Sequence, residues 1–274
     1  MTLARSLLCA HGAALVFGLA GMLIALPHPE LWASSPLGQQ VFAFGMQDAG
    51  ALHMLLGAAA MLAFGVAGLG WRRTAIFFVA ACGLSLSAEL IGTSTGYPFG
   101  NYEYTAGLGV KILGRVPFSI PLSWFYMGLA SFLLGGVLSR WRPVSSVVLG
   151  AWLLTAWDLV LDPAMAHPSL ALNFWVWHTA GPYFGMPVQN FVGWTATSGL
   201  FMGLSRWLWG APVPSVSPGY PLAVYGLNLV FALVLSAAGG EWLPMGVALA
   251  AALGAAVVSA RIAAHPGLSP GAAT

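Results

Sequence analysis

The sequence predicts an all-α, polytopic integral membrane protein with about eight transmembrane helices. Of its 274 residues, 59% are hydrophobic and only 6% are charged, and the mean hydropathy is +0.84. A water-soluble domain usually carries about 25% charged residues, because charged side chains cover its surface. Apolar residues here also recur in runs near the ~20 residues that cross ~30 Å of hydrocarbon. Much of the folded surface must therefore face lipid, and membrane lipid is an expected partner.

Eight apolar runs have the length of a membrane span, and none alternates in polarity as a strand of a membrane barrel would. The first follows Arg5 and is longer than the ~7–15 apolar residues of a signal peptide. We therefore predict one transmembrane helical domain over residues 1–264 and a disordered tail over 265–274. Gly199 and Gly203, four residues apart, predict a helix-packing contact. The predicted spans are residues 6–26, 49–70, 74–92, 118–140, 144–165, 188–209, 219–238 and 243–262.

The basic residues support eight spans with both termini in the cytoplasm, because Arg and Lys concentrate in cytoplasmic loops. Only Lys111 and Arg115 of the nine basic residues then fall on the opposite side. We expect a multi-pass protein of the cytoplasmic membrane. The formal net charge of +2 is small and scattered, which argues against nucleic acid as a partner. The basic residues on the cytoplasmic side are Arg5, Arg72, Arg73, Arg140, Arg142, Arg206 and Arg261.

All seven acidic residues fall on the non-cytoplasmic side of this topology, and Glu89, Asp158 and Asp162 lie within predicted spans. A carboxylate at that depth costs about 2.5–3.5 kcal/mol on insertion scales, so it should face the bundle interior and have a partner or a function. Asp158 and Asp162 are four residues apart and share one helix face. Because close carboxylates repel each other, one is expected to hold its proton near neutral pH. A polar pair that only holds helices together is the alternative.

Three irregular segments lie on the same side as the acids, at residues 91–104, 116–125 and 173–194. They are rich in aromatic residues, glycine and proline, and the first is too interrupted to form a helix. Aromatic belts at membrane interfaces account for part of this composition. They do not account for His178 and Asn190 beside the acids. We therefore predict a functional site at this end of the bundle.

Four blocks of sequence resemble those of a known enzyme family. They read ELIGTSTGYPFGNYEY from Glu89, VPFSIPLSWF from Val116, AWDLVLDP from Ala156 and WVWHTAGPYFGMPVQNFVGW from Trp175. Together they look like the hallmark blocks of the CruF-type carotenoid 1′,2′-hydratases. The resemblance implies addition of water across the terminal C1′=C2′ double bond of an acyclic carotenoid ψ-end, as in γ-carotene or lycopene, to give a tertiary alcohol. It implies no redox cofactor and no metal, and it makes carotenoid-pathway enzymes possible partners.

Hydration of a trisubstituted alkene gives these side chains defined roles. A carboxylic acid protonates the less substituted carbon, and water then captures the tertiary carbocation. Asp158 or Asp162 is the expected proton donor, and Pro163 disfavours Asp162 because it suggests a helix end. Glu89 is expected to be the charge partner or the base that orients water. Aromatic faces stabilise a cation by up to ~2 kcal/mol each. The candidates for binding substrate or holding water are Tyr97, Tyr102, Trp124, Trp157, Trp177, His178, Asn190 and Trp194.

Two other function classes remain open. A UbiA-like membrane prenyltransferase also uses DxxxD pairs, but it needs two acidic motifs for Mg²⁺–diphosphate, and one is present here. A non-enzymatic, proton-coupled transporter or carrier also places acids in the membrane, but it would spread polar residues through the full membrane depth. A di-iron hydroxylase needs grouped histidines. Here His11 and His28 are isolated, and His53 is best explained as a partner of Asp48.

Overall fold

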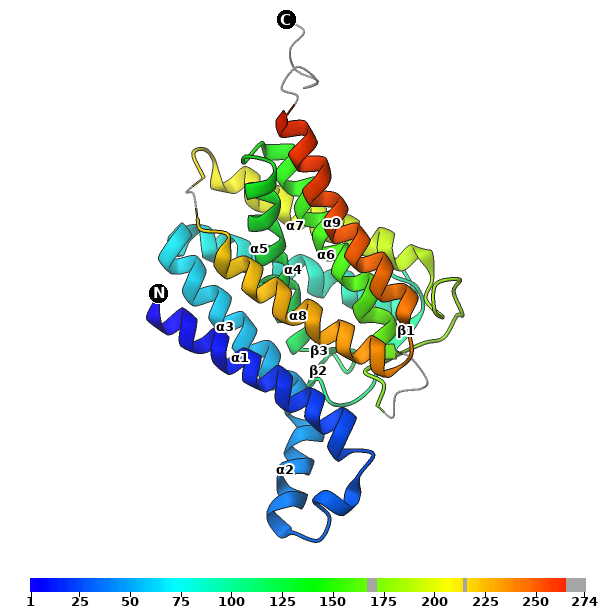
Figure 1. Cartoon of the computed structure of the whole chain (residues 1–274). Helices are drawn as coiled ribbons and strands as arrows, with labels where there is room; N and C mark the ends of the chain where they lie inside the picture. The colour runs from blue at the N-terminus through cyan, green and yellow to red at the C-terminus, as the bar shows by residue number, and fades with distance from the viewer. Residues whose placement is uncertain (167–171, 214–215, 265–274) are drawn as a thin grey trace, which may run out of the picture.

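The all-α membrane fold is confirmed by the computed structural model, which describes residues 1–166, 172–213 and 216–264 (Figure 1). Each of the eight predicted spans coincides with one long helix, and the predicted tail 265–274 lies outside the described residues. Among the described residues, six of these helices, all except α7 and α9, are long and apolar enough to cross a membrane. The long helices are α1 (Thr2–Ala20), α3 (Ala49–Leu69), α4 (Trp71–Thr95), α5 (Ser119–Leu138), α6 (Pro143–Ala166), α7 (Val188–Trp209), α8 (Gly219–Ala238) and α9 (Trp242–Ala264).

The chain begins and α9 ends at the same end of the bundle, away from the short strands (Figure 1). Two small antiparallel sheets lie at the opposite end. In the first, β1 (Tyr102–Tyr104) pairs with β4 (Trp175–Trp177), so that Tyr102 is opposite Trp177 and Tyr104 is opposite Trp175. In the second, β2 (Lys111–Ile112) pairs with β3 (Val116–Pro117). The first sheet joins two of the irregular segments that the sequence placed on the side of the acids.

Helix α5 is the centre of the bundle. It packs against α3, α4, α6 and α8, and nearly all of its side chains are buried. A helix that is apolar on every face is buried in a protein core or in a membrane, and α5 is covered by its neighbouring helices. Its polar side chains Ser119 and Ser123 are satisfied locally, because their hydroxyls donate to the carbonyls of Leu108 and Ile120. α5 therefore supplies an interior wall for the other helices.

Gly135 of α5 and Gly150 of α6 allow these two helices to approach closely. A Cβ atom on Gly135 would lie 2.5 Å from the backbone nitrogen of Gly150. Small residues let the backbones of membrane helices approach in this way. The prediction that Gly199 and Gly203 form a packing contact is wrong within the described chain, because a Cβ atom on either meets nothing within 4 Å. The spacing alone did not identify which glycines face a neighbour.

One predicted helix end is also wrong, and the helix end that Pro163 suggested is absent. α4 continues to Thr95, so the first residues of the irregular segment 91–104 are helical, and the helix ends at Gly96 with a φ of +80°. α6 continues past Pro163 to Ala166. Proline removes the hydrogen bond to the carbonyl four residues before it, here that of Leu159. The hydroxyl of Tyr183 donates to this carbonyl at 2.9 Å and replaces the lost partner.

One helix was not predicted. α2 (Pro36–Gln47) projects from the bundle with the segment that joins it to α1 (Figure 1). Ser35 caps it, since its hydroxyl accepts from the Gly38 nitrogen at 3.3 Å and Pro36 occupies the first turn. With 12 residues, α2 is too short to span a bilayer, and a search for spans therefore passes over it.

Candidate active site

Glu89 is held on the inner side of α4 by three donors. It is only 3% exposed. The Trp124 indole donates to its Oε1 at 3.0 Å, and the Tyr104 hydroxyl donates to its Oε2 at 2.9 Å. The Tyr102 hydroxyl donates to the same Oε2. Tyr102 and Tyr104 are two residues apart on β1, so their side chains leave the strand on the same face.

The two tyrosines remain protonated donors over a wide range of pH. Burial raises the pKa of both Tyr102 and Tyr104 well above the ordinary value, and the nearby charge of Glu89 raises both further. Glu103, between them on the strand, points the other way and its side chain is 67% exposed. The strand thus separates two inward tyrosines from one outward carboxylate. Glu103 is a natural control for the acids of the site.

Asp158 and Asp162 lie one turn apart on α6 and share a single partner. The side-chain amide of Asn190, on α7, donates to Asp158 Oδ2 at 3.1 Å and also to Asp162 Oδ2. All three side chains are buried. Asp158 Oδ1 has no hydrogen-bond partner among the described residues. The two carboxyl groups can therefore share one proton. The unpaired Asp158 Oδ1 can accept a further hydrogen bond from a ligand or water.

These groups surround a cavity of about 60 Å³, which we call the acid cavity. Glu89 and Asp162 provide its acidic groups and Asn190 and Asn228 its amide groups, while Asp158 does not line it and contacts Asn190. The indoles of Trp124 and Trp194 stack at 4.0 Å, and Trp157 meets Trp194 edge to face. Each bound water needs about 10–15 Å³ of such space, so the cavity holds a few waters or the end of an isoprenoid chain. Its aromatic wall comprises Tyr102, Tyr104, Trp124, Trp157, Trp175, Trp177 and Trp194.

The structure does not bring two of the sequence candidates to this cavity. Tyr97 is 71% exposed, beyond the end of α4. The His178 imidazole is partly exposed and lies 3.9 Å from Glu103 on the outer side of the β1–β4 sheet. The remaining predicted residues either line the cavity or, like Asp158, contact a residue that does. Tyr97 and His178 belong to the surface around the site.

A second polar cluster lies on the same cavity and was missed. Asn228 of α8 accepts a hydrogen bond from the Tyr126 hydroxyl at 3.0 Å, and its amide lies 3.0 Å from His11 Nε2. His11 is therefore not isolated, contrary to the prediction. His53 lines the cavity, and its ring lies 6.1 Å from that of His11. A single Asn within an apolar span indicates a polar site inside the bundle. The sequence does not show which residues it contacts, because its partners are distant along the chain.

Within the described ranges, no three His, Cys, Asp or Glu side chains are grouped to hold a metal ion. The acids instead accept hydrogen bonds from Tyr, Trp and Asn donors. Such a site offers proton donors and acceptors next to aromatic faces. It suits acid–base chemistry on an apolar molecule.

Comparisons with known proteins agree with this geometry. Residues 49–255 match the family model described as carotenoid biosynthesis protein. The chain is also 30% identical, over 262 residues, to bisanhydrobacterioruberin hydratase of Haloarcula japonica. That alignment covers 89% of this chain and 81% of the relative. No solved structure matches the chain. The resemblance to carotenoid hydratases is confirmed, and the chain belongs to the carotenoid biosynthesis protein family.

Proposed function

We propose that this enzyme adds water across the terminal C1′=C2′ double bond of an acyclic carotenoid ψ-end and forms a tertiary 1′-hydroxy group. One observation carries the proposal: Asp162, whose carboxyl group shares the Asn190 amide with buried Asp158, lines a small cavity with an aromatic wall. The family match and the hydratase named above support the same class of reaction. Lycopene and γ-carotene are suitable substrates because each carries a ψ-end.

Asp162 is the proposed proton donor, because it lines the acid cavity and Asp158 does not. The π electrons of the double bond take its proton, and a C–H bond forms at C2′. Asp162 is left as a carboxylate and C1′ as a tertiary cation. Asp158 acts as a positioning residue: repulsion between the two neighbouring carboxylates favours one shared proton, and the Asn190 amide holds both carboxyl groups in place.

The cation forms next to aromatic faces and close to a fixed acceptor. Trp124, Trp157 and Trp194 provide π faces, each worth up to ~2 kcal/mol to a desolvated cation. Water bonds to C1′ and gives up one proton to Glu89, which Tyr102 and Tyr104 hold in place. Return of that proton to the aspartate pair completes the cycle. Alkene plus water becomes alcohol, and no electron is gained or lost.

The first test is expression in cells that accumulate lycopene, grown in H₂¹⁸O, with the pigments analysed by mass spectrometry. The expected product is heavier by one water and carries ¹⁸O. An oxygenase would take its oxygen from O₂ and leave the label out. Unchanged pigment from correctly inserted protein, with both lycopene and γ-carotene supplied, would refute the proposal.

The second test assigns the acid. Asp162→Asn is expected to lower product formation by about 100-fold or more, the usual worth of a general acid. Glu103→Gln, an exposed acid on the neighbouring strand, is the matched control and is expected to stay near the wild-type rate. Equal activity of Asp162→Asn and wild type would remove Asp162 from the mechanism.

A further inference from the structure

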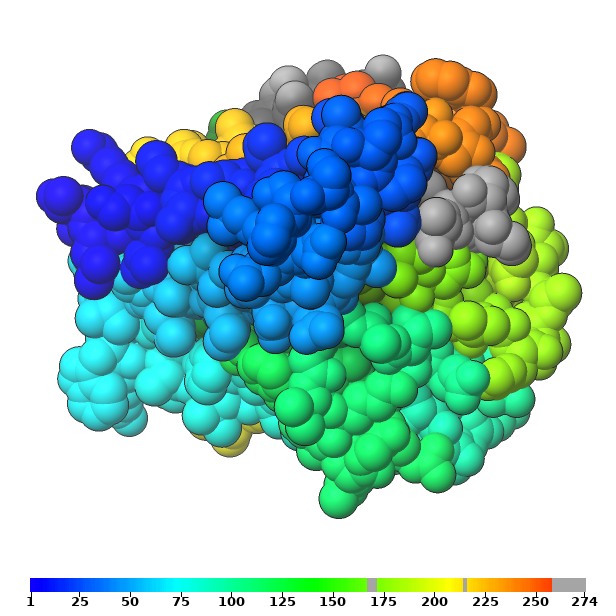
Figure 2. All heavy atoms as spheres, turned by 90° about the horizontal axis from the view of Figure 1, so that it is seen from below, coloured from blue at the N-terminus to red at the C-terminus, as the bar shows by residue number. Residues whose placement is uncertain are grey.

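A second and larger cavity lies beside the acid cavity, between α1, α2 and the start of α3. Its volume is about 300 Å³ and its lining is overwhelmingly apolar. We call it the apolar groove. Seen from below, the blue N-terminal elements that form it lie across this face of the bundle (Figure 2). The residues that define it are Phe17, Gly18, Gly21, Trp32, Phe42 and Gly45.

The two cavities meet. His53, Met165 and Phe231 line both of them. The rings of His53 and Phe231 lie 5.9 Å apart, so aromatic side chains frame the junction. A molecule that occupied both cavities would place one end among the acids and the rest of its length along α1 and α2.

The acid cavity alone does not accommodate a carotenoid. Its volume of about 60 Å³ fits the reacting end and water. A binding site for an organic ligand usually measures about 300–1,000 Å³, the range into which the groove falls. The remaining polyene chain is apolar and rigid, and it needs a surface of the kind that the groove provides.

The groove also reaches the lipid-facing surface. Ile24, Leu31 and Val41 line it, and they are 54%, 65% and 45% exposed. Ile24 lies within the first candidate span, so its exposed side chain faces hydrocarbon. A substrate dissolved in the bilayer therefore has access to the groove from the side.

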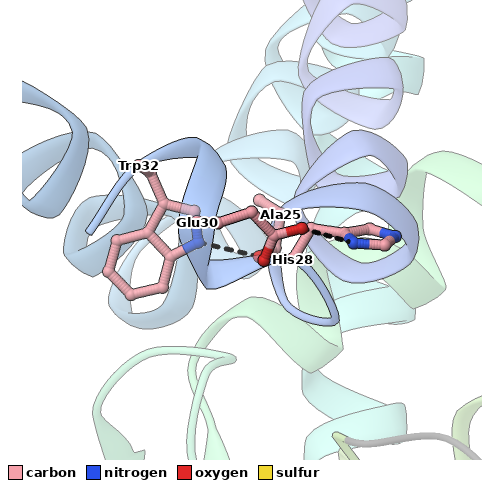
Figure 3. A network of polar contacts seen from close by, with 4 residues as sticks. All are labelled: Ala25, His28, Glu30 and Trp32. Carbon is pink, nitrogen blue, oxygen red and sulfur yellow. Dashed lines mark hydrogen bonds and ion pairs between the residues drawn. The ribbon is translucent and has the colours of Figure 1, made fainter. Parts of the chain in front are cut away.

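Trp32 stabilises the outer rim of the groove through two contacts. The Trp32 indole donates to the Ala25 carbonyl at 2.7 Å and ties the π-helical turn Gly21–Ala25, which follows α1, to the turn before α2 (Figure 3). Its ring stacks on Phe42 of α2 at 3.9 Å, with an interplanar angle of 8°. On the exposed side of the same turn, His28 contacts Glu30 at 2.9 Å. One tryptophan thus holds the two helices that form the groove.

We propose that the apolar groove binds the polyene chain of the carotenoid substrate and that the ψ-end passes the His53–Met165–Phe231 junction to reach Asp162. This inference rests on the proposed function. Most of the residues that line the groove precede residue 49, where the family match begins, and the others, like the acid-cavity residues used in the mechanism, lie within it. The groove is therefore the part of the site in which substrate selection by chain and far-end structure would reside.

The test fills the groove without touching the acids. A Cβ atom on Gly18 or on Gly21 meets nothing within 4 Å, so Gly18→Phe and Gly21→Phe place a ring in open space. The same holds for Gly83 of α4, which lines neither cavity, and Gly83→Phe is the matched control. Lycopene binding to each protein in nanodiscs is measured by quenching of tryptophan fluorescence, and hydration by mass spectrometry.

At least tenfold weaker lycopene binding in both groove variants, with Gly83→Phe like wild type, is the expected result. Unchanged binding in Gly18→Phe and Gly21→Phe would overturn the inference. If wild type binds lycopene but makes no alcohol, the proposed function fails. The binding data for the variants still test whether the groove holds the polyene chain. If wild type neither binds nor hydrates lycopene or γ-carotene, both fall together.

A cysteine variant provides a second test if the phenyl rings of Gly18→Phe and Gly21→Phe prevent membrane insertion of the protein. Gly18→Cys in a Cys9→Ser background introduces one thiol into the groove, and Cys9 is removed because it is exposed. Lycopene in the nanodisc is expected to slow maleimide labelling of this thiol at least tenfold. Labelling of Gly83→Cys in the same background is expected to stay constant. Equal labelling of Gly18→Cys with and without lycopene contradicts the inference.

Discussion

The Tyr183 hydroxyl donates a hydrogen bond to the Leu159 carbonyl at 2.9 Å, and this carbonyl is the one that Pro163 deprives of its helical partner. The contact allows α6 to continue through Pro163 and keeps Asp162 within a helix. Burial raises the pKa of Tyr183 to about 12, with further contributions from the charges of Asp158 and Glu241. A loop residue thereby supports the helix that carries both aspartates.

This relationship predicts a pH dependence of stability. An unfolded tyrosine ionises near pH 10, whereas folded Tyr183 keeps its proton to about pH 12. The stabilisation is therefore complete below pH 10 and is lost as the pH rises through 12. Tyr183→Phe is expected to unfold more easily at pH 8 and to lose less stability than wild type between pH 10 and 12. Denaturant unfolding of both proteins at pH 8, 10 and 12 measures this. Equal losses of stability in the two proteins between pH 10 and 12 would contradict it.

Removing the shared amide is expected to impair the aspartate pair. Asn190→Leu leaves Asp158 and Asp162 without their common donor, at a cost of about 1–3 kcal/mol for an unsatisfied buried group. Hydration per inserted protein is expected to fall at least tenfold. Thr195→Val is the control, because it removes a hydroxyl of α7 that bonds Thr155 instead of the acids. A Thr195→Val enzyme as impaired as Asn190→Leu would show that the loss comes from helix packing.

The two tyrosines on Glu89 are expected to act as a unit. Both donate to Glu89 Oε2, so either one alone still satisfies that oxygen. Tyr102→Phe and Tyr104→Phe are each expected to cost less than tenfold in hydration rate. The double variant is expected to lose more than the product of the single losses. Single-turnover rates of the four proteins give the coupling, and strictly multiplicative losses would argue that the two hydroxyls act independently.

The close approach of α5 and α6 predicts a stability difference between glycines. Gly135→Leu forces a side chain against the Gly150 backbone, and such overpacking costs about 1–3 kcal/mol. Gly203→Leu enters open space and is expected to be nearly neutral. Unfolding midpoints in nanodiscs compare the two. If Gly203→Leu is the more damaging, the packing contact lies on the predicted α7 pair instead.

Membrane orientation can be read from the loops. Lys111 lies in the β2–β3 hairpin, and Arg142 lies in the turn between α5 and α6. With both termini in the cytoplasm, a membrane-impermeant maleimide is expected to label Lys111→Cys but not Arg142→Cys in intact bacterial cells, in a background without Cys9 and Cys82. Disrupted cells, in which both are labelled, provide the control. The reverse pattern in intact cells would place the acids on the cytoplasmic side.

The sequence alone predicted the helices and the end of the bundle at which the acids gather. Apolar length specifies a span, and a fixed topology places Glu89, Asp162 and Asn190 at one end. Local pattern did not predict which aromatic residues turn inward. Tyr102 faces Glu89 while Tyr97 is exposed, because a short strand and the turn before it set these directions.

The missed residues depend on contacts between distant parts of the chain. Trp175 reaches the cavity because β4 pairs with β1 in a particular register. Pro163 suggested a helix end because proline removes a helical hydrogen bond. The Tyr183 hydroxyl that replaces this bond comes from another segment of the chain. Helix α2 has no span-length signal, yet it forms one side of the groove. Each case requires knowledge of the packed bundle.

The contact of His11 with Asn228 has a consequence for biogenesis. These residues are 217 positions apart, on the first and seventh long helices. Helix α1 leaves the ribosome with a polar imidazole that must wait for α8 before Asn228 can satisfy it. Until then the part of the acid-cavity lining that Asn228 forms with Tyr126 is incomplete. A nascent chain halted before α8 is thus expected to carry all three acids in the bilayer and yet remain inactive, so that the chemistry begins only when synthesis is nearly finished.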